Sequence, residues 1–335
     1  MTTASDRVLD RRTFVVGGVA ALAAPLAAEA QQSAKIPRVG YLFSFTRAGG
    51  EHLWDACREG LRELGYVEGR DIVLEPRWAN GQHEKLPRLV AELVRAKVDV
   101  IVAAATPANL AAKAGASTTP IVMVAVADPV GAGLIASLAR PGGTVTGLTL
   151  LTPDLSGKRL ALLLEVLPRN AKRIAVLTNL DNGSHEVFVR ETTVAAKTRG
   201  IELQRVDARR REHLEPSFNA VKQTRASGLI VFDDPVLWDF RDEIVALAAR
   251  HGVPVMYGYR EFTDEGGLMS YGPHRPDLYR RTAIYVDKLL KGAKPGDLPI
   301  EQPTRFEMII NVKAGRALDL TIPPSLLARA DQVIE

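Results

Sequence analysis

The chain has 335 residues, of which 46% are hydrophobic, and its 43 basic and 39 acidic side chains give a net charge of +4. This balance is typical of a water-soluble globular protein, and the basic residues are too scattered among acidic ones to indicate nucleic-acid binding. The length predicts two domains of ordinary size. Cys57 is the only cysteine, which excludes an intramolecular disulfide and a cysteine-based zinc cluster, and we expect it to be a buried structural thiol.

The amino terminus has the pattern of an export signal. Arg11 and Arg12 precede a short apolar run of small residues, and the run ends at an A-x-A cleavage pattern, Ala28-Glu29-Ala30. The arginine pair resembles a twin-arginine signal, although Asp10 stands where a serine is usual, so general secretion is the alternative. We therefore predict residues 1–30 as an export signal, cleaved near Ala30, and a periplasmic mature protein.

Beyond the signal, the same succession of strands and helices occurs twice. Short apolar runs separated by amphipathic stretches predict parallel strands alternating with helices. In the first half the predicted strands are 38–43, 72–78, 98–103 and 120–126, and in the second half they are 173–178, 201–203, 228–232 and 254–257. The stretch 145–158 joins the halves. The pattern predicts an α/β protein with two Rossmann-like lobes, each with a parallel sheet, joined by about three crossovers.

Polar and aromatic residues follow the strands of the first half, at the edge where ligands bind in open parallel sheets. Ser44 and Thr46 could donate to a ligand or cap the next helix, and Phe45 could stack on a ligand or cover the lobe. Thr106, with Pro107 after it, is the expected cap of a helix whose amino terminus could also hold a carboxylate. Asp128 could meet a ligand ammonium or cap the following turn.

The second half repeats these positions. The loop that contains Asn179 and Ser184 lies 135 residues after the loop that begins at Ser44 (179 − 44 = 135), so we expect both loops to face one cleft. Asp233 is a candidate ligand contact, while Asp234 before Pro235 has the pattern of a helix cap. Tyr257, at the end of its strand, could cover a ligand side chain.

Several longer motifs carry a resemblance to a known family. The motifs are Gly60-Leu61-Arg62-Glu63-Leu64-Gly65-Tyr66, Val126-Ala127-Asp128-Pro129-Val130, Leu138 to Gly147, Gly292 to Pro303 and Ile322 to Ile334. Together they resemble the ABC-transporter substrate-binding proteins related to tryptophan-binding lipoproteins. The resemblance implies the type I periplasmic-binding-protein fold and an extracytoplasmic receptor that closes on a small solute for an ABC permease of the inner membrane. Some relatives bind aromatic or branched amino acids.

From the residues and the resemblance together, we expect residues 31–150 with 273–308 to form lobe 1, and 151–272 with 309–335 to form lobe 2. The expected ligand is an amino acid or a related carboxylate, bound by a monomer without cofactor or metal. The expected ligand contacts are Ser44, Phe45, Thr46, Thr106, Asp128, Asn179, Ser184, Asp233 and Tyr257.

Two other functions share this architecture. A periplasmic sensor would hand its closed form to a membrane signalling protein, and the residues do not separate it from a transport receptor. A two-lobed enzyme is disfavoured, because the chain has no G-x-S-x-G, no H-E-x-x-H and no glycine-rich phosphate loop, and its six histidines have no metal-ligand spacing.

Overall fold

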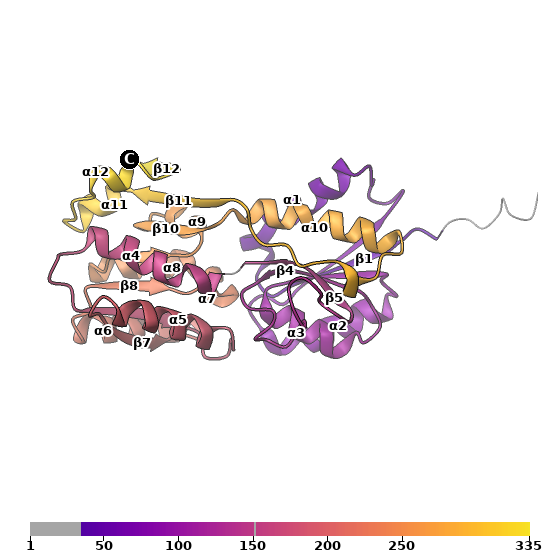
Figure 1. Ribbon diagram of the computed structural model, residues 1–335, viewed down its shortest axis with the longest axis horizontal. Helices are drawn as coiled ribbons and strands as arrows, with labels where there is room; N and C mark the ends of the chain where they lie inside the picture. The colour runs from indigo at the N-terminus through magenta and orange to yellow at the C-terminus, as the bar shows by residue number, and fades with distance from the viewer. Residues whose placement is uncertain (1–34, 151) are drawn as a thin grey trace, which may run out of the picture. The chain divides into compact units, whose positions relative to one another are not determined.

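The computed structural model describes residues 35–150 and 152–335, so the predicted export signal lies outside the described residues. Contacts divide the chain into Met1–Ile36 and one compact unit, Pro37–Glu335, and the fold described below is that of the second unit. Two separate sheets organise this unit, each with its own helices (Figure 1). We call the sheet of five strands, with the helices that pack on it, lobe 1, and the sheet of seven strands with its helices lobe 2.

The sheet of lobe 1 is parallel and has the order β2-β1-β3-β4-β5. β3 and β4 are runs of β-branched and small apolar residues, buried along their whole length, as expected for strands covered on both faces. The strands and helices are β1 (Arg38–Phe43), α1 (Arg47–Glu63), β2 (Val73–Trp78), α2 (Leu86–Arg95), β3 (Val100–Ala104), α3 (Thr106–Gly115), β4 (Ile121–Val126) and β5 (Val145–Thr149).

The sheet of lobe 2 has the order β12-β11-β10-β9-β8-β6-β7. Its first elements are α4 (Ser156–Val166), β6 (Arg173–Thr178), α5 (His185–Lys197), β7 (Glu202–Asp207), α6 (Leu214–Gln223) and β8 (Gly228–Val231). The next are α7 (Pro235–Asp239), α8 (Arg241–His251), β9 (Val255–Tyr257), α9 (Arg260–Asp264) and β10 (Met269–Pro273). The last are α10 (Arg275–Leu290), β11 (Phe306–Asn311), α11 (Val312–Ala317), α12 (Pro324–Leu327) and β12 (Gln332–Ile334).

The chain passes between the sheets three times: from β5 to α4, from β10 to α10, and from the end of the α10 segment to β11. α10 follows a strand of lobe 2 but packs along α1 and against β4 and β5 of lobe 1 (Figure 1). An isolated bridge between Leu148 and Glu301 keeps the returning segment on the edge of the first sheet. The two-lobed α/β architecture with its crossovers is therefore the one expected from the repeated strand pattern.

Two local predictions need correction. β10 and β11 pair antiparallel, because β10 leaves lobe 2 for α10 and β11 re-enters from lobe 1 beside it. Thr106 is the first residue of α3, and the cap position belongs to Ala105, so Thr106 is not the helix cap.

The described residues form three apolar clusters, and the largest contains residues of both lobes. Cys57 lies in this cluster, fully buried under α10, and burial raises the pKa of its thiol to about 12, as expected of a structural thiol. From lobe 1 the cluster includes Tyr41, Phe43 and Phe45, and from lobe 2 it includes Trp238. The lobes are thus joined by packed aromatic side chains as well as by the three chain crossings.

Candidate interlobe binding site

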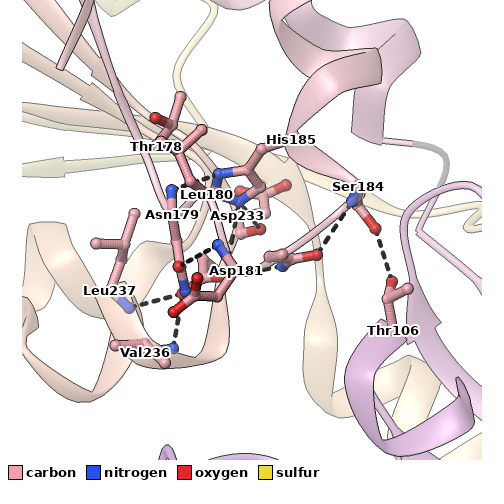
Figure 2. Close-up of polar contacts among 12 residues, drawn as sticks. Thr106, Thr178, Asn179, Leu180, Asp181, Ser184, His185, Asp233, Val236 and Leu237 are labelled. Atoms are coloured by element: carbon pink, nitrogen blue, oxygen red, sulfur yellow. Dashed lines mark hydrogen bonds and ion pairs between the residues drawn. The ribbon is translucent and has the colours of Figure 1, made fainter. Parts of the chain in front are cut away.

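The loops that follow the facing strands of the two lobes contact each other directly. Ser184, after β6, donates from its hydroxyl to the Thr106 hydroxyl of lobe 1 at 3.0 Å (Figure 2). Asp239 of α7 accepts from the backbone N–H of Thr46 at 3.0 Å and from its hydroxyl at 2.7 Å. In each contact the partners come from opposite lobes, so the edges at the carboxyl ends of the parallel strands of the two sheets meet here.

Ser44 and Phe45, which follow β1, have buried side chains. Ser44 is fully buried and donates to the carbonyl of Ala104, the last residue of β3. Phe45 is buried, with its ring centre 4.8 Å from that of Trp238 of lobe 2 in an edge-to-face geometry. Ser44 therefore ties two strands of lobe 1 together, and Phe45 forms part of the contact between lobes.

Thr46 caps α1 as well as contacting lobe 2. Its hydroxyl accepts from the backbone N–H of Gly49 at 3.3 Å, in the manner of a helix cap. The Asp239 carboxylate that faces it is largely buried, and desolvation raises the pKa of this carboxyl to about 6, even though its bonds to Thr46 act in the opposite direction. The Asp239 carboxyl that faces Thr46 therefore ionises at a higher pH than an exposed aspartate does.

The amino terminus of α3 lies in strained backbone. Ala105 has φ 71° and ψ 163°, a region that residues with a side chain rarely adopt. A cavity of about 310 Å³ begins beside it, lined by Thr106 and Asp128 of lobe 1 and Ser184 of lobe 2. Asp128 accepts from the Gly131 backbone N–H at 2.8 Å, so this carboxylate caps its turn while it lines the cavity.

Asp234 is the centre of a buried hydrogen-bond network in lobe 2. Its carboxylate accepts from the side-chain amides of Asn179 and Asn182, and from the backbone N–H groups of Val236 and Leu237 at the start of α7. The predicted helix cap at Asp234 is confirmed. The network fixes α7, and with it Trp238 and Asp239, against the loop that contains Asn179.

His185 completes this network as a neutral ring. Its Nδ1 accepts from the Asn179 backbone N–H at 2.7 Å, so its proton is on Nε2, which faces the carbonyl of Asp233 at 3.4 Å (Figure 2). Burial lowers the pKa of this imidazole, although the Asp234 charge acts in the opposite direction. His185 therefore holds the two loops of lobe 2 at a fixed separation without adding charge.

Asp233 has a buried partner that the sequence did not reveal. Arg159 of α4 donates to its carboxylate at 3.1 Å and to the Tyr271 carbonyl at 2.8 Å, and both side chains of the ion pair are 1% exposed. The carboxylate is therefore already neutralised within lobe 2. Tyr257 lies elsewhere, buried within lobe 2 in the wall of a separate cavity of about 480 Å³ bounded by α8, α9 and α11.

Tyr257 is the one predicted ligand contact that lies away from the facing edges, in the wall of the other cavity. The structure brings the other eight to the two facing edges: Ser44, Phe45, Thr46, Thr106, Asp128, Asn179, Ser184 and Asp233. Sequence reasoning missed Arg159, Trp238, Asp239 and Arg275. Trp238 and Asp239 belong to the short helix that the Asp-Pro pair at 234–235 predicts, directly after a strand. That position could have identified them as residues of the facing edge. Nothing in the local sequence marks Arg159.

Within residues 35–150 and 152–335, no group of three or more His, Cys, Asp or Glu side chains is placed to hold a metal ion. No helix in these same ranges is both long and apolar enough to cross a membrane.

Two lobes with parallel sheets, three crossings and polar loops in contact at the facing edges define a two-lobed solute-binding protein of type I architecture. The sequence profile of the ABC transporter substrate binding proteins matches residues 50–334, and the chain belongs to this family. The family consists of substrate-binding proteins.

Individual relatives support the assignment. A tyrosine-binding protein of Clostridioides difficile (strain R20291) is 26% identical over 263 residues, 78% of this chain and 75% of the relative. The crystal structure of a conserved domain protein from Vibrio cholerae O1 biovar eltor str. N16961 has a TM-score of 0.84 at 27% identity, covering 89% of this chain and all of the other. An ABC domain in complex with L-Trp from Streptococcus pneumonia has a TM-score of 0.82 at 25% identity, covering 89% and 99%.

Proposed function

We propose that this protein is the periplasmic receptor of an ABC importer and that it closes its two lobes on an amino acid or a related small carboxylate. The observation that supports this most strongly is the pairing of loops from opposite lobes, Ser184 with Thr106 and Asp239 with Thr46. A ligand that contacts both loops stabilises the closed arrangement, because it gains contacts there that the open arrangement lacks. The permease would recognise the closed form.

Two relatives indicate which ligands to test first. One is named for tyrosine binding and another was crystallised with L-Trp, so aromatic amino acids are the first candidates. The cavity beside Thr106, Asp128 and Ser184 has the size of a small-molecule site, about 300 Å³ or more. In this proposal the Thr106 and Ser184 hydroxyls contact the ligand, and Asp128 faces its ammonium group.

The pairing of Asp233 with Arg159 changes the role proposed for Asp233. A carboxylate that already has a buried cation partner attracts a second cation weakly, so we propose that Asp233 orients Arg159 and the loop before α7. Ser44, Phe45, Thr46 and Asn179 are proposed to shape the facing edges, through the strand, aromatic and capping contacts described above. Tyr257 is not part of the proposed ligand contacts.

Calorimetric titration tests the proposal. The mature protein, starting at Gln31, is titrated with L-tryptophan, L-tyrosine, L-leucine and benzoate, with matched thermal-shift measurements. A ligand at ~100 times its Kd is expected to stabilise the folded state by about 2.7 kcal/mol. Thr106→Ala and Ser184→Ala are expected to weaken binding, whereas Thr193→Ala, which removes a hydroxyl bonded within α5, is the control. A lack of binding to any of the four compounds would contradict the proposed ligand class.

A further inference from the structure

Arg275, the first residue of α10, is an arginine held almost entirely inside the protein. Only 5% of its side chain is exposed. Its guanidinium carbon lies 4.0 Å from the ring centre of Trp238 and 4.2 Å from that of Tyr259. Among the described residues, Glu261 of α9 forms an ion pair with it, with Oε1 3.3 Å from Nη1. The guanidinium is therefore sandwiched between two aromatic rings, with its charge balanced at one end only.

The Nε–H of the guanidinium has no acceptor. Within the described ranges, the Nε–H of Arg275 is buried without a hydrogen bond, and so is the indole Nε1–H of Trp238, whose side chain is packed against it. The hydroxyl of Tyr279, one turn further along α10 on the same face, lies beside the Arg275 guanidinium and has no acceptor for its own proton. A buried donor without an acceptor destabilises the folded state, so three together require an explanation.

These donors come from both lobes. Trp238 belongs to α7 of lobe 2, while α10 packs on α1 of lobe 1, and Trp238 also contacts Phe45 of lobe 1 edge to face. The donors of α7 and α10 therefore lie together at the contact between the lobes. Glu261 has a second partner, His52 of α1, at 3.0 Å, so it remains paired if Arg275 turns toward another anion.

We propose that Arg275, Trp238 and Tyr279 form a carboxylate-binding subsite at the contact between the lobes. All three groups are donors, and the Nε edge of a guanidinium suits bidentate binding of a carboxylate. Phe45, Trp238 and Tyr259 make the walls aromatic, which favours a carboxylate attached to a planar group. The inference rests on the proposed receptor function and assigns the carboxylate to this subsite instead of to the amino terminus of α3.

Three conservative variants each remove one donor group and keep much of the side-chain packing around it. Trp238→Phe removes the indole N–H and keeps an aromatic ring beside Phe45, and Tyr279→Phe removes only the hydroxyl. Arg275→Lys keeps the charge opposite Glu261 and removes the Nε edge. Tyr285→Phe is the matched control, because this hydroxyl on the same helix donates to the Pro299 carbonyl.

The probes are benzoate, L-tyrosine and L-tryptophan. Each is compared with its primary amide, in which an uncharged group replaces the carboxylate, and binding to the mature protein is measured by calorimetry. A hydrogen bond to a charged group contributes about 1.5–3 kcal/mol, so each of the three variants is expected to lose about 10-fold or more in affinity for the carboxylates. The Tyr285→Phe control is expected to bind as the wild type does, and the amides are expected to bind weakly to all forms.

The outcomes are distinct. Binding of a carboxylate by the wild type, with losses in Trp238→Phe, Tyr279→Phe and Arg275→Lys, supports the subsite. Carboxylate binding that all three variants retain overturns the subsite and leaves the receptor function intact. Amide binding equal to carboxylate binding also overturns it. Binding of none of the six probes contradicts both the subsite and the proposed ligand class.

Discussion

The buried ion pair of Arg159 and Asp233 gives the sharpest stability prediction. In Asp233→Ala the guanidinium stays inside lobe 2, where its side chain is 1% exposed, and loses its counter-charge. It keeps its bond to the Tyr271 carbonyl, which is neutral. Removal of one partner of a buried pair costs about 3–5 kcal/mol. At about 2–4 °C per kcal/mol for a large domain, we expect the Tm to fall by roughly 6–20 °C.

A double-mutant cycle separates the contribution of the ion pair from the other effects of Asp233→Ala on stability. Asp233→Asn keeps an acceptor of the same shape, so its loss should be smaller than that of Asp233→Ala. Arg159→Met together with Asp233→Asn should recover part of the stability, because no buried charge remains. Urea unfolding followed by circular dichroism measures each step. The exposed pair of Arg47 and Glu51 is the control, since solvent screens it and Glu51→Ala should leave the unfolding free energy nearly unchanged. A loss below about 1 kcal/mol for Asp233→Ala would refute the reasoning.

Three further predictions concern pH, packing and export. The pKa of Asp239 is raised from 3.8 to about 6 in the folded protein, so its contribution to stability is present at low pH and is lost as pH rises through 6. Asp239→Asn should therefore stabilise the protein more at pH 8 than at pH 5, by about 1.4 kcal/mol of unfolding free energy, because pH 5 lies about one unit below the folded pKa; an equal effect at both pH values would contradict this. A Cβ at Gly258 would lie 1.6 Å from Asp233 Oδ1, so Gly258→Ala should destabilise by about 1–3 kcal/mol in thermal unfolding, while Gly183→Ala, with open space around it, should not. Mass spectrometry of the periplasmic protein should give an amino terminus near Gln31, and an uncleaved chain would argue against the predicted signal.

The fold was predictable because it follows from short-range patterns. Buried parallel strands such as β3 and β4 are continuous apolar runs, and the recurrence of these runs predicted two similar lobes. The Asp-Pro pair at 234–235 predicted the start of α7 correctly. The antiparallel pairing of β10 and β11 was missed, because it depends on where α10 packs, and that depends on contacts with α1 far away in the sequence.

The candidate site was predictable only in part. Positions after strand ends identified Thr106 and Ser184, which the structure places in contact, but the partners of a side chain are a tertiary property. Thr46 and Asp239 are 193 residues apart, and Arg159 and Asp233 are 74 residues apart. The assignment of Asp233 as a ligand contact remains a prediction, and its pairing with Arg159 could not be inferred from either local sequence.

The central claim is that a small carboxylate holds the two lobes together. Pulsed electron resonance between spin labels tests it most directly, with one label at Arg88→Cys on α2 and one at Val194→Cys on α5, both exposed sites, while the native Cys57 is buried. On addition of the carboxylate that titration shows to bind, we predict that a broad distance distribution becomes a single narrow, shorter one. A distribution that does not change at saturating carboxylate would contradict the account.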